Sequence, residues 1–256
     1  MNQVIHGDCL EVMATFPDNY IDLTVTSPPY DNMRDYNGYD FDFERITKQL
    51  YRITKDGGVV VWVVGDATVD GNETGTSFRQ ALYFKETGFK LHDTMIYEKS
   101  QACFGSNYCY LQAFEYMFVF SKGKPKTINF IRDRKNVRSG EESASAGGVK
   151  RDGTKPKRIS MNMAEYGKRK NVWCYGVGGG KIDHPAVFPE QLANDHIISW
   201  SNEGDLILDP MCGSGTTCKM AMLNNRNYIG IDISEEYCEI ARKRIAEHEQ
   251  QQTLFN

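Results

Sequence analysis

The sequence has no long apolar run, and this absence bears on where the protein works. No stretch approaches the roughly 20 consecutive apolar residues that a membrane-spanning helix needs. The first residues, Met1-Asn2-Gln3, do not form the basic segment followed by an apolar one that a secretory signal shows. We therefore expect an intracellular protein of the cytoplasm with no membrane partner.

Paired cysteines are also missing. The seven cysteines form no CxxC pair, and their odd number argues against a closed disulfide framework. Without paired ligand spacing a zinc site is not expected either. The cysteines are predicted to be reduced thiols, and no metal site is predicted.

The net charge is small, −4, but it hides a strongly basic region. Between Ser121 and Lys170 there are 15 Lys and Arg against five Asp and Glu, so half of the 30 basic residues lie in one fifth of the chain. Such clustering is typical of a surface that contacts phosphates. A solvated loop is the alternative, because the part from Ser139 to Gly153 is rich in glycine, serine and charge.

Strand and helix patterns alternate along most of the chain, which indicates an α/β fold with a mainly parallel, doubly wound, Rossmann-like sheet covered on both faces. Asp56-Gly57-Gly58 is expected to form a turn before a buried strand at 59–64, and Pro189 to lie in the first turn of a helix. The expected organisation is residues 1–121, an inserted basic region at 122–182, residues 183–248 and a C-terminal tail at 249–256.

Thr26-Ser27-Pro28-Pro29-Tyr30 directly follows the apolar run 21–25, so it lies at the carboxyl end of an expected strand, where ligands of open α/β sheets bind. Two prolines remove two amide donors, and the exposed carbonyls that remain can only accept hydrogen bonds. A serine oxygen and a proline carbonyl could take the two protons of an exocyclic amine while the tyrosine stacks on the ring. A proline-stiffened turn with a packed tyrosine is the alternative for this motif taken alone.

A glycine turn follows the expected strand 206–209. Pro210-Met211-Cys212-Gly213-Ser214-Gly215-Thr216-Thr217 leads into a helix, and the next strand ends in Asp232. Glycine permits a tight turn and close approach of a ligand to the backbone, and an acid at that place can accept from ribose hydroxyls. The pattern has GxG without the third glycine of GxGxxG, so it indicates a nucleoside site other than one for NAD.

Together these motifs resemble the DNA amino-methyltransferases that use S-adenosylmethionine, in the group whose catalytic motif precedes the cofactor motif. The resemblance covers most of the chain and rests on motif order: His6-Gly7-Asp8-Cys9, TSPPY, 115–122, 184–189, and DPMCGSGTT with Gly230-Ile231-Asp232. It implies a catalytic half at 1–121, a target-recognition region at 122–182 and a cofactor-binding half at 183–248.

The resemblance also implies roles for single residues. In similar enzymes the glycine turn faces the methionine part of the cofactor, the acid matching Asp232 holds the ribose, and the acid matching Asp8 meets the adenine amine; the segment matching 184–189 closes over the methionine end. Asp8 could instead cap a helix, and His184 could be a packing histidine. The implied cofactor-binding residues are Asp8, Cys9, His184, Pro185, Phe188, Asp209, Pro210, Cys212, Gly213, Ser214, Gly215, Thr216, Asp232 and Ile233.

The implied catalytic residues are Ser27, Pro28, Pro29 and Tyr30, acting on a base flipped out of double-stranded DNA. Serine before Pro-Pro-Tyr is associated mostly with the N4 amine of cytosine and aspartate with the N6 amine of adenine, so N4 is favoured and N6 is the alternative. No Pro-Cys dipeptide occurs, which counts against methylation at carbon 5 of cytosine. A restriction-modification setting is implied, and the expected DNA-contacting residues are Arg34, Tyr36, Lys155, Lys157, Arg158, Lys168, Arg169 and Lys170.

Three further hypotheses stay open at this point. A protein-glutamine methyltransferase or a non-catalytic DNA-binding protein is less favoured, because the serine and the glycine turn are intact and the motif order differs from the glutamine enzymes. Gln251–Phe255 resembles the short peptide that docks on the bacterial sliding clamp, against a frayed tail that binds nothing. The oligomeric state is left as monomer or homodimer.

Overall fold

The computed structural model describes residues 2–29, 41–100, 110–140, 142–144, 153–154, 160–176 and 189–255. It divides into two compact units, one made of Met1–Asn129 with Asn171–Asn256 and the other of Phe130–Lys170. The second unit spans fewer residues than the insert expected at 122–182. Among the described residues no helix is long and apolar enough to cross a membrane.

An eight-stranded sheet organises the first unit, in the order β1-β14-β13-β2-β3-β7-β6-β12. β14 pairs in parallel with β1 and β13, β2 pairs in parallel with β13 and β3, and β12 pairs in parallel with β6. Only β7 runs antiparallel to its neighbours, β3 and β6. The predicted α/β fold with a mainly parallel sheet is therefore confirmed. The strands are β1 (Gln3–His6), β2 (Ile21–Thr26), β3 (Thr54–Val64), β6 (Lys90–Lys99), β7 (Phe114–Ser121), β12 (Val172–Tyr175), β13 (Leu206–Asp209) and β14 (Asn227–Asp232).

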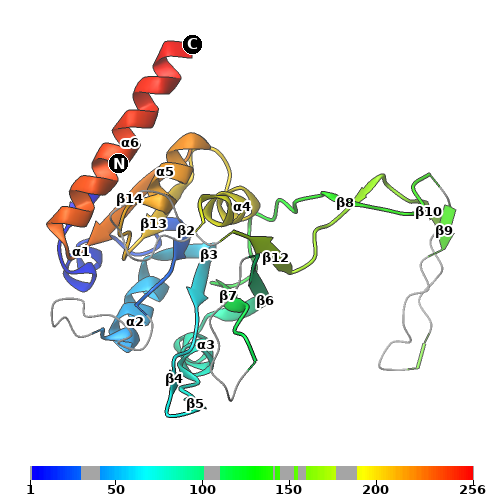
Figure 1. Ribbon diagram of the computed structural model, residues 1–256, viewed down its shortest axis with the longest axis horizontal. Coiled ribbons are helices and arrows are strands. Elements are labelled where there is room, and N and C mark those ends of the chain that lie inside the picture. Colours follow the sequence, from blue (N-terminus) through cyan, green and yellow to red (C-terminus); the bar gives the residue numbers. More distant parts are fainter. Residues whose placement is uncertain are drawn as a thin grey trace. The chain divides into compact units, whose positions relative to one another are not determined.

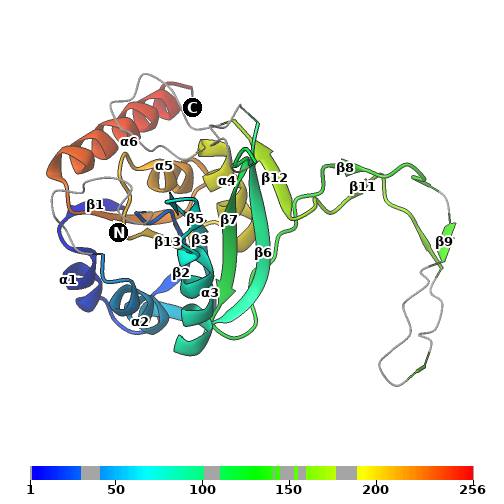
Figure 2. The ribbon, with the colours of Figure 1, turned by 60° about the horizontal axis from the view of Figure 1, so that its bottom comes forward.

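Helices cover both faces of this sheet, as Figure 2 shows with the sheet nearly edge-on. One layer consists of α1 (Cys9–Ala14), α2 (Phe43–Ile53) and α3 (Thr76–Thr87), which contact one another in that order. The other layer consists of α4 (Glu190–Trp200), α5 (Thr216–Leu223) and α6 (Glu235–Phe255), in which α5 contacts both of the others. The first unit is therefore a three-layer sandwich (Figure 1).

Aromatic and β-branched side chains build the core between the sheet and the first helix layer. Residues 59–64 of β3 are at most 1% exposed, as expected for a strand buried on both faces. Phe84 of α3 stacks on Phe120 of β7 with ring centroids 4.2 Å apart and meets Trp62 edge-on at 5.2 Å. Burial of such large rings supplies much of the packing energy that holds the helix on the sheet.

Three local expectations need correction. Asp56-Gly57-Gly58 is not a turn before β3 but part of it: Gly57 takes φ +81° and its amide donates to the Lys122 carbonyl, while the register with β2 shifts between Ile21 and Leu23. Pro189 is the N-cap residue of α4 and has an extended backbone. It therefore precedes the first turn of the helix and does not lie in it. α6 continues through Phe255, so 249–255 is helix in place of a separate tail; the clamp hypothesis itself stays a prediction.

The second unit consists of short antiparallel ladders. β8 (Arg134–Lys135) pairs with β11 (Tyr166–Gly167), and β9 (Glu142–Ala144) pairs with β10 (Ser160–Asn162). A similar small hairpin, β4 (Thr68–Val69) with β5 (Asn72–Glu73), precedes α3 in the first unit.

Candidate active site

The sheet order brings four sequence motifs to one edge of the sheet. β1, β14, β13 and β2 are parallel neighbours, so their carboxyl ends meet where α/β proteins bind ligands. Asp8 follows β1, Asp232 ends β14, Asp209 ends β13 and Ser27 follows β2. Residues from the two ends of the sequence are thus gathered by strand pairing alone.

Asp232 is fixed in position by backbone amides. Its Oδ2 accepts from the Gly213 amide at 2.8 Å and its Oδ1 from the Ser234 amide at 2.9 Å. The amide of Gly7 donates to the Asp232 carbonyl at 2.9 Å. The half-buried carboxylate therefore joins the glycine turn to the end of β14 and keeps lone pairs free for further donors.

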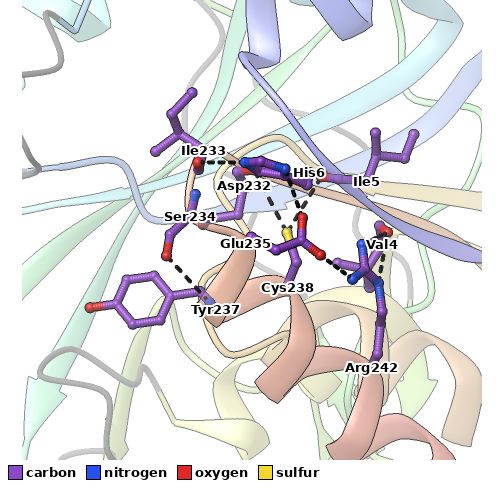
Figure 3. A network of polar contacts seen from close by, with 10 residues as sticks. All are labelled: Val4, Ile5, His6, Asp232, Ile233, Ser234, Glu235, Tyr237, Cys238 and Arg242. Carbon is purple, nitrogen blue, oxygen red and sulfur yellow. Dashed lines mark hydrogen bonds and ion pairs between the residues drawn. The ribbon is translucent and has the colours of Figure 1, made fainter.

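A polar network surrounds Asp232 and ties β1 to α6 (Figure 3). His6 contacts the Glu235 carboxylate through Nδ1 at 2.7 Å and the Ile233 carbonyl through Nε2 at 3.1 Å. Arg242 donates to Glu235 at 2.7 Å and to the Val4 carbonyl at 3.0 Å, and its hydrogen bond lowers the pKa of Glu235. Sequence reasoning missed these partners, although Glu235 and Arg242 lie two helical turns apart on one face.

Asp8 serves as the N-cap of α1. Its Oδ1 accepts from the Leu10 amide at 2.7 Å, which is the role that the sequence left as the alternative to cofactor contact. The neighbouring Cys9 is buried, and that burial raises the pKa of its thiol to about 12. Cys9 is therefore a neutral packing group, and contact of either side chain with a cofactor stays a prediction.

Gly215 is required by packing as much as by any ligand. It takes φ +77°, and a Cβ there would lie 2.6 Å from the Cβ of Ala241 on α6. Gly213 also has a left-handed backbone, with φ +48°. The turn can therefore pack closely against α6 and lead into α5 only because these positions lack side chains.

Most side chains of the glycine turn point into the protein. Cys212, Ser214 and Thr216 are at most 6% exposed, and Arg244 of α6 donates to the carbonyl and hydroxyl oxygens of Ser214. Hydrogen bonding from Cys218 and burial raise the pKa of the Cys212 thiol. Contacts between these residues and a cofactor would therefore run through the backbone of the turn.

Two charged residues hold the outer side of this turn. Glu190, the first residue of α4, accepts from Arg244 at 2.9 Å and from Lys219 of α5 at 2.7 Å. Lys219 and Arg244 together lower the pKa of Glu190, against the raising effect of its partial burial. The cluster links all three helices of the second layer around the glycine turn.

Asp209 lies deepest of the acids at this edge. It is 3% exposed, and its Oδ1 accepts from the Thr26 hydroxyl at 2.8 Å and from the Met211 amide at 3.2 Å. Burial raises the pKa of Asp209 to about 6, although these hydrogen bonds act in the opposite direction. Pro210, next along the chain, is buried as well.

The expected catalytic motif begins where β2 ends. Thr26 is the last residue of β2, Ser27 and Pro29 are half-buried, and Pro28 is buried. The structure thus places the serine at the sheet edge beside Asp209. Tyr30 lies outside the described residues.

Several other expected site residues also lie outside the described part of the chain. They are Arg34, Tyr36, Lys155, Lys157, Arg158, His184, Pro185 and Phe188. Of the remaining cofactor candidates, Ile233 is 43% exposed at the rim beside Asp232.

Basic side chains of the second unit are partly engaged within it. The ammonium group of Lys168 lies 3.7 Å from the ring centroid of Phe130, and Arg169 forms an ion pair with Asp133. Lys170 also has an interaction within the structure. All three cations therefore have partners within the protein. Phosphate contact by Lys168, Arg169 and Lys170 stays a prediction.

Of the described cysteines, which are all free thiols, Cys9, Cys212, Cys218 and Cys238 are buried in the core, whereas Cys174 is exposed. In the part of the chain that the structure describes, no group of three or more His, Cys, Asp or Glu is placed to hold a metal ion.

Comparisons with known proteins agree with this geometry. Residues 21–243 match the N6/N4 methyltransferase family model, described as DNA methylase. The chain is 59% identical to the orphan methyltransferase M.BamHII of Bacillus amyloliquefaciens over 237 residues, 89% of each protein. The chain therefore belongs to the DNA methylase family of N6/N4 amino-methyltransferases and is a DNA methyltransferase.

Solved structures share its fold. The cytosine-N4-specific PvuII DNA methyltransferase superposes with a TM-score of 0.69 at 19% identity, covering 94% of this chain and 85% of that one. The M1.HpyAVI–SAM complex gives a TM-score of 0.65 at 20% identity, covering 95% of this chain and 100% of that one. The predicted methyltransferase form of the Rossmann-like fold is thereby confirmed.

Proposed function

We propose that this DNA methyltransferase moves the methyl group of S-adenosylmethionine to the N4 amine of a cytosine flipped out of double-stranded DNA. The observation that carries the proposal is the position of Ser27, directly after β2 and next to the end of β13, where the glycine turn begins. The acceptor motif and the cofactor motif then face the same space at the sheet edge.

The cofactor half of the site fits a nucleoside that carries a methionine group. Asp232 offers lone pairs to ribose hydroxyls while backbone amides hold its carboxylate still. Asp8 keeps one carboxylate oxygen beyond its cap bond for an adenine amine. The turn at 210–215 offers backbone where side chains point away, which suits close approach of the methionine part. The segment with His184, Pro185 and Phe188 is proposed to close the site.

The acceptor half works by accepting hydrogen bonds. The Ser27 oxygen and the Pro28 carbonyl take hydrogen bonds from the two amine hydrogens, which draws the lone pair of the nitrogen out of conjugation with the ring. Tyr30 stacks on the base and fixes its plane. When bound, S-adenosylmethionine would supply an electrophilic methyl group and leave as S-adenosylhomocysteine, while one amine proton held at Ser27 and Pro28 would pass to solvent. Catalysis is then positioning and electrostatics.

Cytosine N4 is preferred to adenine N6 because serine occupies position 27. In the family, serine at this position is associated mostly with cytosine-N4 enzymes and aspartate mostly with adenine-N6 enzymes. The fold likeness to a cytosine-N4-specific enzyme agrees with this choice but concerns the fold alone. Adenine N6 is the alternative.

Recognition of DNA is assigned to the insert, residues 122–182, together with Arg34 and Tyr36 beside the flipped base. Lys155, Lys157, Arg158, Lys168, Arg169 and Lys170 supply the positive charge for phosphate contacts, which strengthen binding by releasing counterions.

Nucleoside mass spectrometry tests the proposal. Purified protein is incubated with unmethylated bacterial DNA and methyl-deuterated S-adenosylmethionine, and the DNA is digested to nucleosides. N4-methylcytosine carrying the label is expected. Labelled N6-methyladenine would keep the mechanism and replace the base, whereas no labelled nucleoside from any DNA would contradict the proposal.

A further inference from the structure

Backbone pairing between the catalytic strand and the cofactor strand stops before it reaches the site. β2 and β13 are paired at Leu23 with Ile207 and at Thr24 with Leu208. The ladder goes no further, although β2 continues to Thr26 and β13 to Asp209. The end of β2 is still paired with β3 through Thr26 and Trp62, and the end of β13 with β14 through Asp209 and Gly230, but no backbone pair joins the two ends to each other.

Side-chain hydrogen bonds take over at that point. The Thr26 hydroxyl donates to Asp209 Oδ1 at 2.8 Å, joining residues 183 positions apart in the sequence. Thr217, in the first turn of α5, donates to the Val25 carbonyl at 3.1 Å, and its hydroxyl also lowers the pKa of Asp209. The last two residues of β2 are thereby bound to both sides of the glycine turn.

The groups in this network are sealed from solvent and from ligands. Thr26 and Thr217 are at most 1% exposed, and Asp209 is 3% exposed. A carboxylate in such a place lowers stability unless its partners compensate, and an apolar side chain of similar size would pack there at less cost. A buried acid whose hydrogen-bond partners Thr26 and Met211 lie on these two motifs points to a geometric role.

We propose that Thr26 and Asp209 are positioning residues that set the distance between the amine-accepting Ser27 and the glycine turn that receives the methyl donor. In this proposal Asp209 holds β2 and does not contact the cofactor. It therefore replaces the cofactor-binding role that the sequence analysis expected for Asp209. This inference rests on the proposed function, because it concerns alignment of the two reactants named there. A shift of about 1 Å between reacting groups can lower a rate about 100-fold.

Isosteric variants test the positioning role. Thr26→Val removes the donor and keeps the volume, Thr26→Ser keeps the donor, and Asp209→Asn keeps an oxygen for Thr26 while its amide can donate to Thr217. Thr47→Val is the matched control, because Thr47 is equally buried and its hydroxyl bonds only the Phe43 carbonyl of its own helix. For each protein, kcat, KM for DNA, equilibrium affinity for S-adenosylmethionine and Tm are measured.

We expect Thr26→Val to lower kcat about 10- to 100-fold while the affinity for S-adenosylmethionine changes less than about threefold. Thr26→Ser and Asp209→Asn should recover most of kcat, and Thr47→Val should lower Tm with kcat unchanged. A purely structural role would instead lower Tm for Thr26→Val and leave kcat at the level of the Thr47→Val control.

Two results would overturn the inference. One is a Thr26→Val enzyme with wild-type kcat; the other is an Asp209→Asn enzyme that loses affinity for S-adenosylmethionine, which would make Asp209 a direct ligand. Both are read against a wild-type enzyme that methylates DNA. A wild-type protein that methylates no DNA is a different failure, since it removes the proposed function and the positioning role with it.

Discussion

The edge of the main sheet and the basic unit at Phe130–Lys170 are built in different ways. At the sheet edge, Asp209 and Thr26 are almost fully buried, and Asp232 is held by two backbone amides. In the basic unit, Gly167 is the one buried residue among those whose exposure the structure describes. The interactions described in this unit include short ladders, scattered hydrogen bonds, an ion pair and a cation above a ring.

This difference fits the two proposed tasks of methyl transfer and DNA contact. Methyl transfer needs atoms fixed to a fraction of an ångström, and a packed core with short hydrogen bonds supplies that. Contact with DNA phosphates needs positive charge within reach of a long polymer, and exposed lysine and arginine supply that without a core. Changes at the sheet edge should therefore be large and insensitive to salt, and changes in the basic unit should be smaller and dependent on salt.

Ser27→Ala should have the largest effect. Removing one of the two oxygens that accept the amine protons should lower kcat about 100- to 1000-fold, the loss typical of one electrostatic contact in a transition state. Affinity for S-adenosylmethionine should stay at the wild-type value, because Ser27 is proposed to contact the base and not the cofactor. Steady-state kinetics with tritiated cofactor and a separate binding titration check both values. A drop in cofactor affinity would place Ser27 in the wrong half of the site.

The pH dependence of stability should report the buried acid. Burial raises the pKa of Asp209 from about 3.8 to about 6, so the folded protein holds a proton that the unfolded chain has already lost between these values. Stability should therefore fall as pH rises from 4 to 6 and level off above. Relative to Asp209→Asn, which does not titrate, the loss should be on the order of 3 kcal/mol. Urea unfolding of both proteins across this range measures it, and parallel curves would contradict the burial argument.

Asp232→Ala should weaken binding of S-adenosylmethionine by about 10- to 100-fold, because ribose hydroxyls lose a charged acceptor. Asp205→Ala is the matched control, because Asp205 also accepts a hydrogen bond from a backbone amide, that of Asn202, but lies before β13, at the opposite end of that strand from the site. Isothermal titration with the cofactor compares the two. Equal affinities for both variants would remove the ribose assignment.

Neutralising Lys155, Lys157 and Arg158 together should have the smallest effect of these changes when DNA affinity is measured at low salt. It tests most directly the contrast in salt dependence between the basic unit and the sheet edge. Each lost phosphate contact should reduce the slope of log affinity against log salt by about 0.9. A triple variant of Lys85, Lys90 and Lys243, which removes the same charge outside the insert, controls for net charge. Fluorescence anisotropy on duplex DNA at several salt concentrations measures the slopes. Identical slopes for the two triple variants would assign phosphate binding to another surface.

Much of the cofactor half could be predicted from sequence because its signals are local. An apolar run, a glycine turn, a helix and a second run ending in Asp232 are contiguous, and each step follows from backbone preferences. The helix cap at Asp8 is a local signal of the same kind. The motif order and the serine before Pro-Pro-Tyr then identified the family, which the comparisons bear out.

Only the tertiary structure decided what each of these residues touches. Gly215 is needed because Ala241 of α6 packs against it, and Asp209 bonds Thr26, whose strand lies at the other end of the sequence. His6, Glu235 and Arg242 form one network although no local pattern links them. A residue's type and its neighbours in the sequence determine its local backbone conformation. Which distant side chains it contacts depends instead on the strand order of the whole sheet.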